Sequence, residues 1–179
     1  MNVLKEKFQK EILPQIMKKS KYKNIWQVPR LQKAVINVGL GIGTKDSKYI
    51  DIAEETLLRI TGQKPVKTQA RISISNFKVR KGQVIGLKVT LRGVRMYDFV
   101  DKIINVTLPR IRDFRGISLK TVDKNGNLNI GFREHIAFPE IKSDEVEKIH
   151  GLQVTITTSA KSQEEGIELF KLLGFPFTK

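Results

Sequence analysis

The sequence contains no cysteine, which excludes disulfide bonds, thiolate metal sites and cysteine nucleophiles. It also lacks any apolar run near the roughly 18 residues that a transmembrane helix needs. The amino-terminal segment MNVLKEKFQKEILPQIMKK carries a charge within every apolar stretch, which is not typical of a signal peptide. Together these absences favour a cytoplasmic protein.

Acidic residues are missing from one long segment of the chain. Ten Lys or Arg residues and no Asp or Glu lie between Glu55 and Asp98. The net charge of +15 shows the same bias, because residues 1–97 hold 21 cations and 6 acids, whereas residues 98–179 hold 12 of each. So many cations without nearby acids predict an external polyanion, either a nucleic acid or a membrane surface.

The apolar residues favour a single globular domain over residues 1–179, with a basic half 1–97 and a charge-balanced half 98–179. The first predicted helix, 2–19, is expected to bury Val3, Phe8, Ile12 and Ile16 and to bend at Pro14. Further helices are predicted over 46–61, over 95–107 with an end before Pro109, and from a capping box at Ser162 to Gly174.

Alternating polar and apolar residues predict the strands. These are expected within 31–40, 64–70, 83–93 and 152–160, with a hairpin over 117–132 built on Asn125 and Gly126. In the 83–93 strand the core face is predicted to hold Ile85, Leu87, Val89 and Leu91. The fold class is therefore predicted as α+β, a mainly antiparallel sheet with helices packed on one face and a basic open face.

The open face of this sheet is the first candidate binding surface. Its cations would neutralise phosphates, and its amides and hydroxyls would hydrogen-bond to sugars or bases. The alternative is an ordinary solvated face, but such faces usually mix both signs of charge. The predicted surface consists of Lys33, Asn37, Lys67, Gln69, Lys88, Thr90 and Arg92.

A basic loop, RISISNFKVRKG, joins two of the strands and is the second candidate. It surrounds Phe77 with Lys78, Arg80 and Lys81. Phe77 either stacks on a base or anchors the loop on the core, and both readings remain open. Because so little apolar surface holds the loop, we expect it to be mobile in the free protein.

Catalytic and cofactor motifs are weak. Glycines at 39, 41 and 43 follow a predicted strand but lack the G-x-G-x-x-G spacing of a dinucleotide loop. His135 and His150, the only histidines, favour surface or interface positions over a metal pair. We therefore predict no enzyme, no cofactor and no metal site.

Several segments together carry a family resemblance. LLRITGQKPVKTQARIS, VINVGLG, LPRIRDFRG, GFREHIAFPEI and VTITTSAKSQEEGIELFKLLGFPF closely resemble the 5S-rRNA-binding protein five of the large ribosomal subunit, in its bacterial form. The similarity covers nearly the whole chain. It implies a ribosomal protein that helps attach 5S rRNA in the central protuberance, beside 23S rRNA and other proteins there.

The resemblance also implies roles for particular residues. The family's rRNA contacts map onto Asn37, Gln63 and Thr90, and its loop for peptidyl-site tRNA maps onto residues 73–83. A contact with small-subunit protein thirteen is implied as well. The acidic Asp144 and Glu145 are our candidates for it, with a solvated loop as the alternative. The tRNA-binding loop is predicted to use Ser75, Asn76, Lys78, Arg80 and Lys81.

Two other classes of function stay open. A membrane-surface protein would place its basic residues along an amphipathic helix, whereas here they fall on predicted strands and a loop. A nucleotide-dependent enzyme would rest on VGLGIG alone.

Overall fold

The computed structural model describes residues 3–20, 22, 24–41, 47–141 and 149–178. The chain divides into two compact units built from segments far apart in sequence. Neither unit coincides with the basic or the charge-balanced half of the sequence, and the single domain stays a prediction. Unit 1 comprises Met1–Ala34, Leu91–Ile130 and Thr155–Lys179, and unit 2 comprises Val35–Thr90 and Gly131–Val154.

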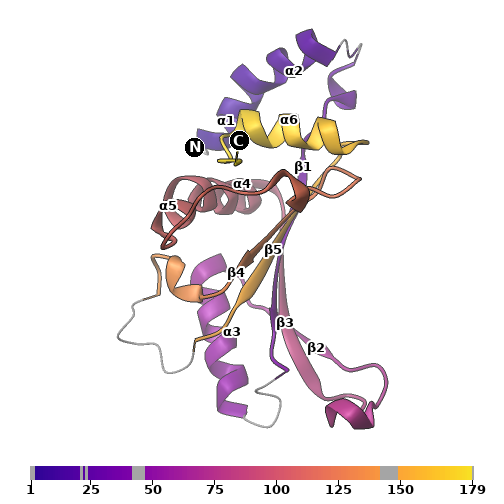
Figure 1. Cartoon of the computed structure of the whole chain (residues 1–179), viewed down its shortest axis with the longest axis vertical. Helices are drawn as coiled ribbons and strands as arrows, with labels where there is room; N and C mark the ends of the chain where they lie inside the picture. Colours follow the sequence, from indigo (N-terminus) through magenta and orange to yellow (C-terminus); the bar gives the residue numbers. More distant parts are fainter. Residues whose placement is uncertain (1–2, 21, 23, 42–46, 142–148, 179) are drawn as a thin grey trace. The chain divides into compact units, whose positions relative to one another are not determined.

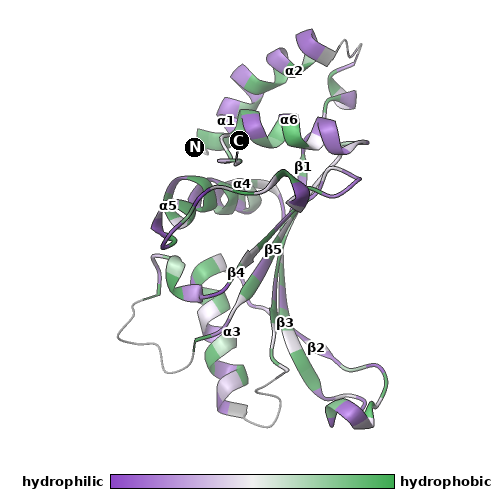
Figure 2. Ribbon diagram, in the orientation of Figure 1, coloured by the Kyte–Doolittle hydropathy of each residue, from purple (hydrophilic) through white to green (hydrophobic). Residues whose placement is uncertain are grey.

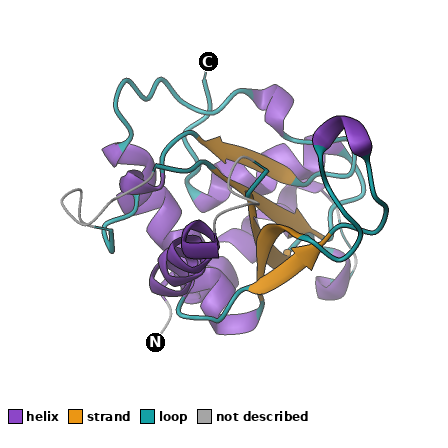
Figure 3. Ribbon diagram, turned by 90° about the horizontal axis from the view of Figure 1, so that it is seen from below, coloured by secondary structure: helices purple, strands orange, loops and turns teal. Residues whose placement is uncertain are grey.

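Five strands form one antiparallel sheet in the order β2-β3-β1-β5-β4 (Figures 1 and 3). Together with the helices, this sheet confirms the α+β prediction. Each of the four strand segments predicted outside the hairpin contains a strand. The strands are β1 (Leu31–Gly39), β2 (Val66–Gln69), β3 (Val84–Leu91), β4 (Leu128–Phe132) and β5 (Leu152–Thr158).

The predicted hairpin is only half correct. Its turn is present, because Gly126 has a φ of 74° and donates its amide to the Asp123 carbonyl at 3.0 Å. Its second arm is β4, but its first arm holds a 3-10 turn, Leu119–Thr121, and a single bridge from Val122 to Leu128. The arm departs from a strand because Ile117 pairs instead with Phe177, far along the chain.

Three helical stretches belong to unit 1, and both chain termini lie in this unit (Figure 1). The capping box of the last one is confirmed, since Ser162 Oγ accepts from the Glu165 amide at 3.3 Å. The first stretch runs through α1 (Val3–Lys7), the π-helical turn η1 (Phe8–Ile12) and α2 (Leu13–Ser20). The second runs through α4 (Gly93–Lys102), the π-helical turn η4 (Ile103–Thr107) and α5 (Leu108–Arg110), and the third is α6 (Gln163–Leu173).

In each of the two interrupted helices, a proline follows shortly after the π-helical turn. Pro14 and Pro109 each stand two residues after the last residue of a π-helical turn. Proline cannot donate to the preceding turn and clashes with it, and a wider π turn is a common place for such a helix to adjust. The prediction that the helix ends before Pro109 is therefore wrong, because it continues to Arg110.

The first helix buries residues four apart. Leu4, Phe8, Ile12 and Ile16 are at most 6% exposed, which matches the i, i+4 stacking on one helix face. The prediction of Val3 as a core residue is wrong, since Val3 is 73% exposed and Leu4 takes its place.

Unit 2 packs one helix, α3 (Ser47–Thr61), with strands of the sheet. Ala53 and Leu57 are fully buried on the inner face of this helix. From β3, Leu87 and Val89 are buried as predicted, but Ile85 is 36% exposed. Ile85 lies where the β2–β3 pairing becomes irregular, so the alternation that predicted it as core does not hold at that position.

Candidate nucleic-acid interface

Three polar residues of unit 2 point away from its buried core. Asn37 in β1, and Lys88 and Thr90 in β3, alternate with strand neighbours that are at most 1% exposed. Successive side chains of a strand point to opposite faces, so these three share the face turned from the core. Asn37 and Lys88 are exposed and Thr90 is half-buried. We call this surface the open face of unit 2.

Gln63 contacts β3 from the turn that ends α3. Gly62, at a φ of 65°, donates its amide to the Leu58 carbonyl at 2.8 Å and stops the helix. Thr61 Oγ1 accepts from the Gln63 amide at 3.3 Å and fixes the next residue. Gln63 Nε2 then donates to the Thr90 carbonyl oxygen at 3.3 Å. Two of the residues singled out by the family resemblance are therefore neighbours.

Lys33 and Arg92 belong to unit 1. Lys33 is half-buried in β1, and Arg92 is exposed at the residue that precedes α4. Their membership of one surface with Asn37 stays a prediction.

The placement of Lys67 on the open face is wrong. In the antiparallel β2–β3 pair, Lys67 stands opposite Leu87, and directly opposed residues share a face of the sheet. Lys67 therefore points to the buried side, where its Nζ lies 2.9 Å from Glu54 Oε2 and 3.6 Å from Asp51 Oδ1. The hydrogen bond to Glu54 is the main cause that raises the pKa of Lys67.

The other β2 residues follow from the same register. Val66 and Thr68 stand opposite Lys88 and Gly86 and so share the open face, which the sequence reading missed. Val66 is 62% exposed although it is apolar. Beyond an irregularity after Thr68, Gln69 is exposed, and its place on the open face stays a prediction.

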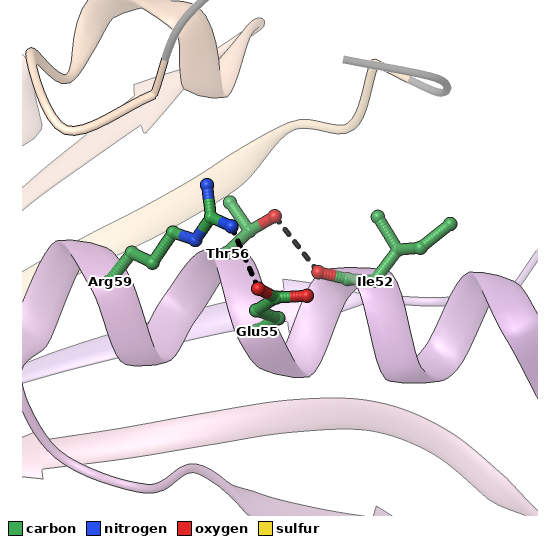
Figure 4. Close-up of polar contacts among 4 residues, drawn as sticks. All are labelled: Ile52, Glu55, Thr56 and Arg59. Atoms are coloured by element: carbon green, nitrogen blue, oxygen red, sulfur yellow. Dashed lines mark hydrogen bonds and ion pairs between the residues drawn. The ribbon is translucent and has the colours of Figure 1, made fainter. Parts of the chain in front are cut away.

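Helix α3 supplies acids that the acid-free segment lacks. Arg59 Nη2 lies 2.8 Å from Glu55 Oε1 (Figure 4). Lys64 Nζ lies 4.0 Å from Glu54 Oε1. With Lys67, three of the ten cations between Glu55 and Asp98 have carboxylate neighbours among the described residues. The expectation that these ten lack internal partners is wrong for this group.

The remaining cations of the segment differ. Lys88 and the loop cations Lys78, Arg80 and Lys81 are exposed. None of the four forms an ion pair with a carboxylate in the part of the chain that the structure describes.

The basic loop has a folded backbone. Ile74 and Val79 exchange two amide hydrogen bonds of 3.0 and 3.2 Å around a 3-10 turn, Ser75–Phe77. The Lys81 amide donates to Ser73 Oγ at 2.9 Å, and the Arg80 amide donates to Gln83 Oε1 at 3.1 Å. The loop is thus shaped by its own hydrogen bonds, and its mobility in the free protein stays a prediction.

The side chains of the loop point outward. Phe77 is 75% exposed and Ile72 is 73% exposed, so Phe77 does not anchor the loop on the core. Figure 2 shows hydrophobic and hydrophilic stretches alternating in the loop that joins β2 and β3. Of the two readings of Phe77, base stacking remains.

The two histidines are buried, so the prediction of surface or interface positions is wrong. His135 and His150 are 2% and 5% exposed, and their rings stack at 4.1 Å between centroids. The pairing follows from a backbone contact, in which the His150 amide donates to His135 Nδ1 at 3.3 Å. Burial lowers the pKa of both, that of His150 to about 4.

The remaining candidates are a metal site, a membrane-spanning helix, the acidic pair and the glycine-rich turn. No cluster of three or more metal-ligating side chains occurs among the described residues. No described helix combines the length and the apolar character needed to cross a bilayer. Asp144, Glu145 and the third glycine of VGLGIG, Gly43, lie outside the residues that the structure describes.

Comparison with known proteins gives consistent matches along the chain. Residues 24–80 match the family described as ribosomal protein L5, and residues 84–177 match the model described as the C-terminus of the same ribosomal family. The chain is 55% identical to the large ribosomal subunit protein uL5 of Halothermothrix orenii over 179 residues, all of both chains. It is 52% identical to that of Desulforamulus reducens, over 98% of this chain and 97% of the relative. Identity to that of Carboxydothermus hydrogenoformans is 51%, over 98% of each.

Proposed function

Because the chain belongs to the ribosomal protein L5 family, it is a structural constituent of the large ribosomal subunit, and we propose that it binds 5S rRNA through the open face of unit 2. Members of this family are structural proteins of the ribosome, cytoplasmic in bacteria, and not enzymes. Membership also implies rRNA and other ribosomal components as partners.

The observation that carries the proposal is the separation of charge in unit 2. On the buried side of the sheet, Lys67 is held by Glu54 and Asp51 of α3. On the open face, Lys88 has no carboxylate partner among the described residues. A phosphate backbone supplies the missing countercharge and gains by releasing its own condensed cations.

The neutral polar groups on the open face can recognise sugars and base edges by hydrogen bonding, which the charge of Lys88 alone cannot do. Asn37 offers an amide with donors and an acceptor, and Thr90 offers a hydroxyl. The bond from Gln63 to the Thr90 carbonyl holds the amide of Gln63 against the backbone of β3. Such groups read sugars and base edges, whereas Lys88 positions the backbone.

We propose a second RNA contact for the basic loop, with peptidyl-site tRNA. Its backbone presents Ser75 and Asn76 in the 3-10 turn, followed by Lys78 in the left-handed conformation with a φ of 53°. The exposed ring of Phe77 and the three cations around it suit a single-stranded or unpaired region of RNA.

The family resemblance implies a contact with small-subunit protein thirteen, and we further propose that Asp144 and Glu145, which lie in an acidic cluster, make it. RNA-binding partners are usually basic, so two acids form a suitable contact. Reversing both charges is expected to weaken subunit joining without changing affinity for 5S rRNA. Normal joining at several salt concentrations would contradict this assignment.

A gel-shift comparison tests the central proposal. The protein is expected to bind 5S rRNA more tightly than other RNAs of similar length, and Asn37→Ala is expected to weaken the 5S complex by about 1–3 kcal/mol, the cost of a lost hydrogen bond at a desolvated contact. The matched control is Asn105→Ala, because Asn105 is an exposed amide of unit 1 that bonds only Asp101 in the described contacts. Equal binding of all RNAs, or equal loss in both variants, would contradict the open face as the specific surface.

A further inference from the structure

Unit 1 contains a pocket of about 310 Å³ beside an exposed tryptophan. Phe8, Ile25, Trp26 and Tyr97 form much of its apolar wall, and the cationic side chains of Lys5 and Arg30 also line it. Among the described residues, no carboxylate lines this pocket. Its volume lies at the lower end of the range for small-molecule sites, about 300–1,000 Å³, which suits one planar group.

The apolar residues at its rim are exposed in an unusual way. Trp26 is 74% exposed and Ile25 is 56% exposed, although both are large and apolar. A contiguous exposed apolar surface with a polar rim commonly marks a binding site. The guanidinium of Arg30 lies 5.0 Å from the centroid of the Trp26 ring, a cation–π distance that places positive charge directly at the aromatic surface.

Hydrogen bonds within the protein order the backbone around Trp26. Trp26 lies in a 3-10 turn, Ile25–Gln27, and its amide donates to Oδ1 of the N-cap residue Asn24 at 2.9 Å. The Arg30 amide donates to Ser159 Oγ at 3.0 Å and ties the following residues to another part of unit 1. The turn that carries the ring is therefore already ordered, so binding there costs the protein little conformational entropy.

We propose that this pocket holds one unstacked nucleobase of a ribosomal RNA, stacked against Trp26, with Lys5 and Arg30 beside its phosphates. The proposal rests on the ribosomal function above and adds a third RNA contact, in unit 1, to the open face and the basic loop. A single base fits because an aromatic ring can stack on any base, while neighbouring cations neutralise the phosphates of the RNA backbone. An acidic peptide with an aromatic anchor is the competing occupant, and the test below separates the two.

Trp26 is the only tryptophan of the chain, so its fluorescence reports on this pocket without any engineered label. The full-length protein is titrated with 5S rRNA, and the complex is then titrated with the single-stranded RNA hexaadenylate. Quenching by 5S rRNA assigns the base to that RNA, and quenching only by hexaadenylate on the preformed complex assigns it to another ribosomal RNA. An acidic pentapeptide with a central phenylalanine forms the third arm.

Variants link the fluorescence to the pocket. Trp26→Ala is expected to weaken binding of fluorescein-labelled hexaadenylate about tenfold or more, since stacking is worth about 1–3 kcal/mol per base, and Trp26→Phe should retain most of it. Arg30→Gln is expected to flatten the salt dependence of hexaadenylate binding. Lys171→Gln, an exposed cation of unit 1 that does not line the pocket, is the matched charge control. Because Trp26 is mostly exposed, circular dichroism should show an unchanged fold in Trp26→Ala.

The outcomes separate this site from the proposed function. Unquenched Trp26 with both RNAs, together with normal 5S affinity, overturns the pocket and leaves the 5S proposal standing. Quenching by the acidic peptide alone also overturns it, in favour of a protein partner. Failure of the wild-type protein to bind 5S rRNA, with hexaadenylate still quenching Trp26, overturns the 5S proposal and supports the pocket.

Discussion

Lys67 and Lys88 lie on neighbouring strands of unit 2, within the same acid-free segment, and they use their charges differently. The Lys67 ammonium lies 2.9 Å from Glu54 on the side that packs α3. Lys88 is exposed on the opposite face, with no described carboxylate beside it. A count of cations in the sequence does not distinguish these two roles. The comparison therefore shows that only part of the charge excess is available to RNA.

The two buried histidines differ from both lysines, because they carry no charge at physiological pH. His135 and His150 are stacked and buried, and burial lowers the pKa of each. Both are thus kept neutral at physiological pH. Unit 2 consequently contains paired cations, exposed cations and histidines that are neutral at physiological pH. Four predictions compare these classes with one another and with the neutral polar groups of the open face.

The exposed cations of the loop should give the largest effect. Neutralising Lys78, Arg80 and Lys81 together to Gln is expected to weaken tRNA retention in the peptidyl site about a hundredfold or more, because hydrogen bonds to charged groups contribute about 1.5–3 kcal/mol each. Affinity for 5S rRNA should change much less. Both affinities are measured with purified protein and with ribosomes assembled from it.

The matched control removes the same number of charges from the paired class. The triple variant Arg59→Gln, Lys64→Gln, Lys67→Gln alters cations that face carboxylates of α3, so tRNA retention should remain near normal. If both triple variants lose tRNA equally, net charge rather than placement controls binding. A large loss for 5S rRNA with normal tRNA retention in the loop variant would assign the loop to 5S instead.

The neutral histidines should make folding sensitive to acid. The pKa of His150 falls from its ordinary 6.5 to about 4 on folding, so its contribution to stability is complete above pH 6.5 and is lost as the pH falls toward 4. Full protonation would remove about 3 kcal/mol from the free energy of unfolding. Urea denaturation at pH 7 and pH 4.5 should therefore show a smaller acid-induced loss in His150→Phe than in the wild type.

Tyr49→Phe serves as the control for this measurement. Tyr49 packs edge-on against His150, with ring centroids 6.5 Å apart, and the substitution keeps both histidines. Its pH dependence should match that of the wild type. An equal acid-induced loss in His150→Phe would show that protonation of His150 does not determine the sensitivity.

The neutral groups of the open face should change affinity without changing its salt dependence. Thr90→Val removes a hydroxyl at nearly constant volume, and the affinity for 5S rRNA is expected to fall by about 1–3 kcal/mol. Since no counterion is released by a hydroxyl, the salt slope should stay the same. Thr56→Val is the control, because the Thr56 hydroxyl bonds the Ile52 carbonyl within α3 (Figure 4).

The smallest effect should come from the pair that opened the comparison. Lys88→Gln is expected to flatten the log–log salt slope of 5S binding by about 0.7–0.9, one phosphate contact. Lys67→Gln should leave that slope unchanged and have little effect on stability, because ion pairs that water can reach contribute little. Equal slopes for both variants would remove the distinction between the two faces.

Local pattern was sufficient for most elements of the fold. The helical spacing of Phe8, Ile12 and Ile16 and the capping box at Ser162 depend on neighbours within a few residues, and both are confirmed. The pattern failed where distant segments intervened. The helix continues past Pro109 after a π turn, and the first hairpin arm pairs through Ile117 with Phe177.

For the candidate site residues too, local pattern was sufficient at some positions and contacts between distant segments decided others. Asn37, Lys88 and Thr90 were assigned to one face correctly, because alternation within a strand is a local property. Lys67 was assigned to the wrong face, because its direction depends on the register with β3. The burial of the histidines and the pocket beside Trp26 had no signal in the spacing of the residues, since each is formed by segments that meet only on folding.

By itself, the sequence determined the size and place of the charge excess, the order of helices and strands, and membership of a ribosomal family, because composition, periodicity and similarity are properties of the chain. Only the tertiary structure decided which cations face carboxylates of α3 and which remain for RNA, which histidines stay neutral, and that Trp26 stands exposed beside Arg30. Those outcomes depend on strand register and on contacts between distant residues. A one-residue shift in register turns a strand's side chains to the other face of the sheet, and no local pattern in β2 fixed that register.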